Sequence, residues 1–220
     1  MPTPDDTYRS LHDRTTAAGA TLVAVSKTRP AAEIMRLYAL GHRDFGENRV
    51  AELTEKQATL PADIRWHFIG HLQRNKVKAI APFIHLIHAV DSPRLLREID
   101  KQGRAAGRRI PALLQYHVAA EESKYGLDPA TPTAVFADLE PTELRGVQLR
   151  GVMGMATYTD DTAQIRSEFD RLTAAFQYVK REHFVSDPAF CERSMGMSGD
   201  WEIALAAGST LVRVGSLLFG

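Results

Sequence analysis

The sequence predicts an α/β fold, a single (β/α)8 (TIM) barrel domain over residues 1–220. The first observation is that apolar runs alternate with helical patterns about eight times, at a pitch of roughly 27 residues. Such alternation favours a parallel sheet with its helices outside, and a barrel of this kind needs only about 200 residues. The second is that no GxGxxG or GxxxxGKS/T fingerprint follows the first apolar run, which disfavours the alternative, a doubly wound open sheet.

Eight short apolar runs have the length and boundaries of buried strands. They occupy residues 21–27, 42–48, 64–70, 83–90, 110–118, 147–156, 191–198 and 210–220. Helical patterns fill the intervals, at residues 30–41, 49–58, 72–81, 130–139, 161–182 and 199–208, with a further helix starting at Pro93. The clearest is 161–182, where large apolar residues recur on one face, and the weakest is 130–139. Ser92 precedes Pro93 and is expected to cap that helix.

Charge and composition exclude several classes of protein. Lys+Arg and Asp+Glu are each 27, so no global field attracts nucleic acid or an anionic membrane. The N-terminal stretch MPTPDDTYRSLHDR is acidic and lacks the apolar core of a signal peptide, and no stretch approaches the ~18 apolar residues of a membrane span. The single cysteine rules out an intramolecular disulfide. We therefore expect a cytoplasmic protein, and, without a long heptad or apolar stripe, a monomer.

Polar residues follow several of the predicted strands, where a barrel carries its functional site. They are Lys27, Glu47 with Asn48, His71, Lys124, Ser198 and the stretch Arg213–Ser216. Lys27 ends the apolar run LVAV, and its position allows two interpretations. One is a solvated lysine at the end of a strand. The other is a Schiff-base lysine, held by a rigid strand and partly desolvated so that the neutral amine is available.

Small residues gather in the segments SMGMSGDWE (194–202) and AAGSTLVRVGSLLFG (206–220). Free backbone N–H groups there, with the hydroxyls of Ser198 and Ser216, can bind a phosphate. The alternative is that Gly199 and Gly215 only make tight turns. Arg213 lies two residues before Gly215, on the same strand face. A buried arginine needs a partner, either a ligand acceptor or an internal carboxylate.

The histidines do not predict a metal site. His85 and His88 are three residues apart on a predicted strand, so we expect them on opposite faces. His67 and His71 flank a strand end without a recognisable set of acidic ligands. Because a credible site needs three or four convergent ligands, we expect no metal.

Seven segments, in order along the chain, resemble the pyridoxal phosphate homeostasis protein family. They are VAVSKT (23–28), FGEN (45–48), WHFIGHLQRNK (66–76), EESKYG (121–126), RGVMGMA (150–156), SMGMSGD (194–200) and AAGSTLVRVGSLLFG (206–220). Each is weak alone, but seven in order are specific. The resemblance implies a barrel similar to the barrel domain of alanine racemase. The sequence departs from the family pattern at His71, at Tyr116-His117 and at Ser216, where the family commonly has Pro, Val-Asn and Thr respectively.

The resemblance implies that pyridoxal 5'-phosphate (PLP) is the cofactor, held as an internal aldimine (Schiff base) on Lys27. Ser198, Gly215 and Ser216 would hold the phosphate, Arg213 would face the pyridine nitrogen, and Asn48 would lie beside the ring. Ser216 keeps the hydroxyl of the common threonine, so the phosphate contact should persist.

These residues predict a protein that stores, buffers or delivers PLP, with PLP-dependent apo-enzymes as possible partners and no catalytic activity of its own. An arginine is always protonated, so it would keep the pyridine nitrogen unprotonated and make the ring a poor electron sink. Racemase relatives also need a second domain, for which the barrel pattern leaves no room. One alternative is a single-domain racemase-like enzyme with His71, Tyr158 or Lys124 as its second base. The other is a PLP-free barrel, either a binding module or a lyase acting on a phosphorylated sugar.

Overall fold

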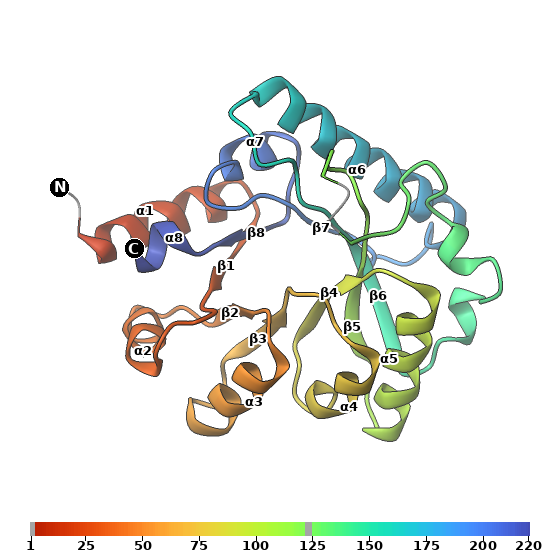
Figure 1. Cartoon of the computed structure of the whole chain (residues 1–220), viewed down its shortest axis with the longest axis horizontal. Coiled ribbons are helices and arrows are strands. Elements are labelled where there is room, and N and C mark those ends of the chain that lie inside the picture. The colour runs from red at the N-terminus through yellow and green to blue at the C-terminus, as the bar shows by residue number, and fades with distance from the viewer. Residues whose placement is uncertain (1–2, 122–124) are drawn as a thin grey trace.

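Eight parallel strands form a closed barrel in the computed structural model, which describes residues 3–121 and 125–220 (Figure 1). Each strand pairs with the next, and the last closes on the first through Thr21↔Leu211 and Ala24↔Val214. The strands are β1 (Thr21–Val25), β2 (Asp44–Glu47), β3 (Arg65–Phe68), β4 (Leu86–Val90), β5 (Ile110–Gln115), β6 (Val147–Met153), β7 (Glu192–Ser194) and β8 (Leu211–Val214). The predicted barrel is confirmed over the open sheet.

Helices surround the barrel, as Figure 1 shows. They are α1 (Pro4–Ala17), α2 (Ala31–Ala39), α3 (Val50–Thr59), α4 (Val77–Ile80), α5 (Pro93–Ala105), α6 (Thr162–His183), α7 (Trp201–Ala206) and α8 (Ser216–Phe219), with 3₁₀ helices η1 (Arg74–Lys76), η2 (Ala134–Phe136) and η3 (Pro141–Glu143). The predicted cap of α5 is confirmed, because the Ser92 hydroxyl accepts a hydrogen bond from the Leu95 N–H. No helix among the described residues is long and apolar enough to cross a membrane.

Three parts of the chain differ from the prediction. Helix α1 was not expected, although the Thr3 and Asp6 side chains form a reciprocal capping box at its start. Residues 130–139 contain only the short helix η2, since Pro132 lacks the N–H that a longer helix would need there. The last apolar run is a strand only over Leu211–Val214, because Gly215 ends β8 and α8 follows it.

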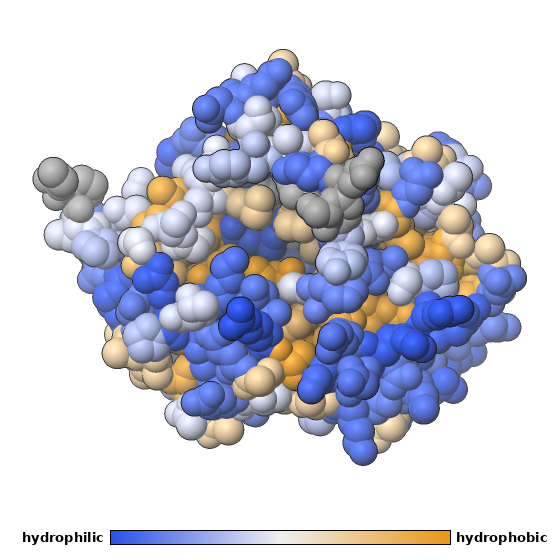
Figure 2. Space-filling model, in the orientation of Figure 1, coloured by the Kyte–Doolittle hydropathy of each residue, from blue (hydrophilic) through white to orange (hydrophobic). Residues whose placement is uncertain are grey.

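The barrel interior differs from the layer between strands and helices. Its apolar cluster is small and consists of Val23, Leu86, Ala89, Leu113, Met153 and Leu211, with Met155 packed against it. Buried polar side chains, among them His67, His88, Ser194 and Arg213, occupy much of the remaining interior. Outside, Figure 2 shows that polar residues cover most of the visible face, with apolar residues visible around its middle. The interior is therefore the unusual, polar region of this molecule.

Candidate functional site

Lys27 directly follows β1 at the carboxyl end of the barrel, in a backbone that is held on both sides. The Ser26 N–H donates to the Gly46 carbonyl at 3.0 Å, and the Thr28 N–H donates to the Glu52 carboxylate at 2.6 Å. Thr28 has a left-handed φ of 62°, which is uncommon for a β-branched residue and occurs at functional sites. The Lys27 side chain itself is exposed, so the partial desolvation expected for this amine is not supplied by neighbouring side chains.

A buried ion pair lies behind Lys27, between the strands and α3. The Lys56 ammonium donates to the Ser26 carbonyl at 2.8 Å, to Glu47 at 2.8 Å and to Glu52 at 2.7 Å. Glu47 also accepts from the Ser26 hydroxyl at 2.6 Å, and burial raises the pKa of this carboxyl. The network fixes the backbone that carries Lys27. Sequence reasoning missed it, because nothing in the pattern around Lys56 distinguishes it from a surface lysine.

Ser198, Gly215 and Ser216 come together at the end of β8. The Gly215 N–H donates to the Ser198 hydroxyl at 3.3 Å, and Ser216 is the next residue along the chain. A Cβ on Gly215 would lie 3.3 Å from Val25, at the end of the adjacent strand β1. Of these residues, Ser198 borders a cavity of 580 Å³ that is also lined by Gly199, Thr157 and Tyr158. Ser198, Gly215 and Ser216 lie at the ends of β7 and β8, next to the strand that carries Lys27, and their binding of a phosphate stays a prediction.

Asn48 follows β2, is half-buried and lies against Gly70. A Cβ on Gly70 would lie only 2.5 Å from the Asn48 carbonyl oxygen. The glycine in the segment WHFIG therefore permits the close approach of the two loops that follow β2 and β3. This contact fixes Asn48 at the same end of the barrel as Lys27.

Arg213 lies deeper in the barrel than Lys27. On β8, Arg213 pairs with Val23 of β1. Val23 lies four positions before Lys27 and on the same strand face. The guanidinium is buried and donates to the Ser194 hydroxyl at 2.5 Å and to the Gly154 carbonyl at 3.1 Å. Burial lowers the pKa of Arg213 to about 10. The hydrogen bonds described for Arg213 go to a hydroxyl and a backbone carbonyl, while the Asp200 carboxylate attracts the guanidinium through its charge.

The positions that depart from the family pattern have structural partners. The His71 ring lies 2.9 Å from the Asp91 carboxylate and stacks on Tyr125, with ring centroids 4.1 Å apart. Tyr116 is buried and its hydroxyl donates to the Pro132 carbonyl. Tyr158, proposed as a second base, is 97% exposed. Lys124, the other lysine considered for that role, lies outside the described residues.

Asp44, His67 and His85 could converge on a metal, since one ligand atom from each lies within 4.8 Å of the others. Two sequence expectations were therefore wrong. His67 has an acidic neighbour, because β2 pairs with β3 in register. His85 and His88 both pack against His67, with ring centroids 5.2 Å away, since His85 precedes β4 and strand alternation does not apply to it.

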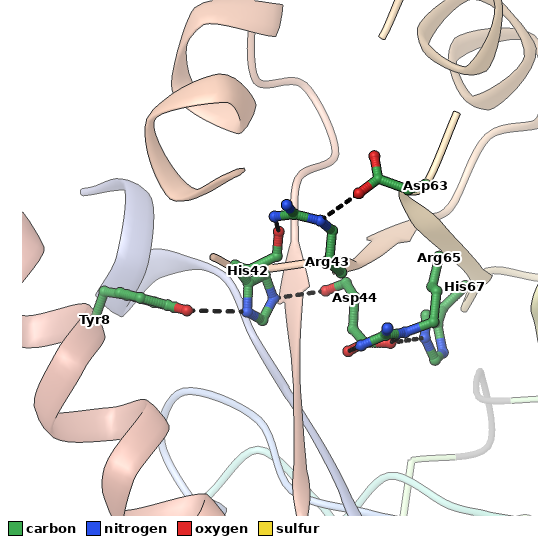
Figure 3. Close-up of polar contacts among 7 residues, drawn as sticks. All are labelled: Tyr8, His42, Arg43, Asp44, Asp63, Arg65 and His67. Atoms are coloured by element: carbon green, nitrogen blue, oxygen red, sulfur yellow. Dashed lines mark hydrogen bonds and ion pairs between the residues drawn. The ribbon is translucent and has the colours of Figure 1, made fainter. Parts of the chain in front are cut away.

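The Asp44 carboxylate already has partners at this amino end of the barrel. Arg65 donates to it from two nitrogens, and His67 lies 3.1 Å away (Figure 3). The positive charge of the Arg65 guanidinium would repel a metal cation bound to the same carboxylate. The arrangement is therefore a salt bridge between β2 and β3, and the absence of a metal stays a prediction.

Comparison with known proteins gives matches along nearly the whole chain. The family model for the alanine racemase N-terminal domain matches residues 5–220. The chain is 37% identical over 202 residues to the pyridoxal phosphate homeostasis protein of Aquifex aeolicus, covering 91% of this chain and 86% of that protein. It is 36% identical over 211 residues to the Homo sapiens protein of the same name, covering 90% and 75% respectively.

Solved structures show the same similarity. PipY of Synechococcus elongatus, with PLP bound, matches with a TM-score of 0.86 and 36% identity over 99% of this chain and 100% of that chain. Alanine racemase from Bartonella henselae, with covalently bound pyridoxal phosphate, matches with a TM-score of 0.73 and 19% identity, over 97% of this chain but 57% of that chain. The second match concerns the fold alone.

Proposed function

We propose that this chain, which belongs to the family of pyridoxal phosphate homeostasis proteins, binds PLP and buffers or delivers it within the cell. The observation that carries the proposal is the juxtaposition of Lys27, the Ser198–Gly215 cradle and Arg213 at neighbouring strands of one barrel. The relative PipY, solved with PLP bound, supports the same cofactor. We extend the proposal to a cytoplasmic, monomeric protein that consists of a single barrel domain.

The residues present fit PLP. The cofactor has an aldehyde, a phosphate and a pyridine nitrogen, and each has a suitable counterpart here. Lys27 supplies an amine at the rim, and Ser198, Gly215 and Ser216 supply hydroxyl and backbone N–H donors. The tight space at Gly215, where a Cβ would approach Val25 to 3.3 Å, suits close contact of an anion with the backbone. Arg213 has N–H groups beyond those used by Ser194 and Gly154.

Each residue then has a defined task. The Lys27 amine would hold the cofactor covalently through its aldehyde, with release of water. The Ser198 hydroxyl and the Gly215 and Ser216 backbone hold the phosphate, and Asn48 borders the ring. Arg213 only donates hydrogen bonds, so it requires an unprotonated acceptor at the pyridine nitrogen. When bound, PLP supplies the electrophilic aldehyde and an electron-withdrawing ring, and an unprotonated ring withdraws electrons less strongly.

We infer storage and delivery rather than catalysis. The curated relatives reported above are named homeostasis proteins and not enzymes. Of the second-base candidates, His71 is bonded to Asp91 and Tyr158 is exposed, which does not favour a positioned acid–base partner for Lys27. No observation on the described residues favours the racemase-like enzyme or the PLP-free barrel over this function.

The test is the absorption spectrum of the purified protein incubated with PLP, followed by borohydride reduction and peptide mass mapping. We expect a visible band that reduction removes, and a pyridoxyl mass on the peptide that contains Lys27. A protein that stays colourless and unlabelled at millimolar PLP would overturn the proposal. A label confined to another lysine would retain PLP binding but reject Lys27 as its anchor.

Delivery needs a separate experiment. The PLP-loaded protein is mixed with a PLP-dependent apo-enzyme, and the recovery of that enzyme's activity is compared with recovery in free PLP at the concentration that the loaded protein releases. We expect faster recovery with the loaded protein. Equal rates would indicate buffering without delivery. Measurable steady-state racemase turnover by the protein alone would support the alternative.

A further inference from the structure

A continuous chain of hydrogen bonds crosses the barrel interior and ends at Arg213. The Arg213 guanidinium donates to the Ser194 hydroxyl at 2.5 Å, and the His88 Nδ1 lies 2.8 Å from the same hydroxyl. The His88 Nε2 lies 2.9 Å from the His67 Nδ1, and the His67 Nε2 lies 3.1 Å from the Asp44 carboxylate. All five side chains are buried.

The chain runs through the interior rather than along the sheet. Its residues come from β8, β7, β4, β3 and β2, and β7 and β4 are not neighbours in the barrel. The bond between Ser194 and His88 can therefore only cross the inside. One end lies at Arg213. The other lies at Asp44, beside Arg65 at the amino end of the barrel (Figure 3), where a cavity of 310 Å³ is also lined by His85 and Arg150.

The two ends, together with the premise that each histidine ring carries a single proton, determine the direction of every bond. Arginine only donates. Asp44 only accepts, because hydrogen bonds from Arg65 and His67 outweigh the effect of burial and hold the pKa of this carboxyl well below its usual range. A neutral histidine has one donor and one acceptor nitrogen, and burial lowers the pKa of His88 well below its usual value. With both histidines neutral, each Nε2 carries the proton, each Nδ1 accepts, and the Ser194 hydroxyl donates to His88.

We propose that Asp44, His67, His88 and Ser194 form a one-way donor chain whose role is to position Arg213 for its contact with the cofactor ring. The acceptor end of each group faces Arg213, so the chain stabilises the buried guanidinium through hydrogen bonds, in addition to the charge attraction of the Asp200 carboxylate. A carboxylate bonded directly to Arg213 would compete for the N–H groups that the ring needs. The four residues are positioning residues, and their role rests on the proposed function.

The first test uses the PLP-free protein and does not depend on cofactor binding. Nitrogen-15 NMR of the imidazole rings reports which nitrogen of each histidine carries its proton. We expect His67 and His88 to be protonated at Nε2 only, with ring protons that exchange slowly with solvent. A proton on Nδ1 of either ring, or averaged tautomers, would overturn the chain even if PLP binds as proposed.

The second test measures PLP binding by Ser194→Ala, with Ser209→Ala as the matched control. Ser209 is a buried serine whose hydroxyl bonds the Met195 carbonyl in the same region, outside the chain. We expect Ser194→Ala to weaken PLP binding roughly tenfold or more and to shift the absorption maximum of the bound cofactor. Ser209→Ala should change neither, and Ser194→Thr, which retains the hydroxyl, should restore both.

Equal PLP affinities and spectra for the two alanine variants would overturn the positioning role. His88→Gln and His42→Gln provide a second pair, because His42 is also a buried histidine but bonds Tyr8 and only the backbone carbonyl of Asp44, not a side chain of the donor chain. Only His88→Gln should shift the spectrum. If the parent protein binds no PLP, the proposed function fails, while the NMR result still decides the chain.

Discussion

The two ends of the barrel are built differently. At the carboxyl end, the site around Lys27 consists of small residues, an exposed lysine and loops, supported from behind by the buried Lys56 network. At the amino end, charged side chains are paired, with Arg65 on Asp44 and Arg150 on Glu192. Figure 3 shows how the amino-end residues of β2 and β3 converge, with α1 contributing Tyr8. The comparison indicates that the carboxyl end is available for a ligand, whereas the amino end maintains the fold.

The largest expected effect is on PLP binding at Lys27, where a substitution should abolish binding without changing the stability of the fold. Lys27→Ala should abolish covalent PLP labelling after borohydride reduction, because the neighbouring Lys56 ammonium is buried in its own ion pairs. The side chain is exposed, so the free energy of unfolding should change by less than about 0.5 kcal/mol. Mass mapping and urea denaturation measure the two quantities, with Lys78→Ala as the control. Persisting label at the wild-type level would contradict the assignment.

The next prediction concerns Gly151 in β6. Its φ is 149°, and a Cβ there would lie 1.9 Å from the Glu192 carbonyl oxygen on the neighbouring strand. Since backbone on both strands would have to move, we expect Gly151→Ala to destabilise the protein by about 4 kcal/mol or more, or to prevent folding. Denaturant midpoints, or loss of soluble expression, measure this. A stable variant would show that the contact between β6 and β7 yields more easily than its geometry indicates.

Acid should destabilise the amino end first. Burial lowers the pKa of His42 to about 4, while an unfolded histidine titrates near 6.5. Below pH 6.5 the unfolded state therefore binds more protons, and stability falls as the pH drops from about 6.5 to 4, by up to about 3 kcal/mol. Urea midpoints at pH 7 and pH 4.5 measure the loss. His42→Gln should reduce this dependence on pH, and an unchanged dependence would contradict the assignment to His42.

The smallest effect is expected at the carboxyl end. A Cβ on Gly215 would lie 3.3 Å from Val25, a contact that small shifts can relieve, and its φ of −120° suits any residue. Gly215→Ala should therefore cost less than about 1 kcal/mol of stability but weaken PLP binding severalfold by crowding the phosphate. Fluorescence titration with PLP checks this. Unaltered affinity for PLP would contradict a contact between its phosphate and Gly215.

The strand order could be predicted from the sequence because it depends on local signals, and the carboxyl-end position of Lys27, Ser198 and Gly215 follows from it. Alternating apolar runs give the barrel, and short motifs mark Lys27, Ser198 and Gly215. Strand ends were less predictable, since Leu217, Leu218 and Phe219 continue an apolar run but form α8. The role of individual predicted site residues remains to be tested with PLP.

The interior chain could not be predicted, because it depends on contacts between strands far apart in the sequence. Ser194 and His88 are separated by 106 positions and meet only when the barrel closes. His67 seemed isolated from acids, since its partner Asp44 belongs to another strand. Strand alternation predicts which residues face inward, but not which inward residues meet across the interior.

The closing seam between β1 and β8 has a consequence for protein synthesis. Lys27 belongs to the first strand, whereas Arg213, Gly215 and Ser216 belong to the last strand and its end. A nascent chain on the ribosome therefore has the lysine long before it has the arginine and the phosphate contacts. Chains that stop before residue 213 lack half of the proposed site, so we expect prematurely terminated products not to bind PLP.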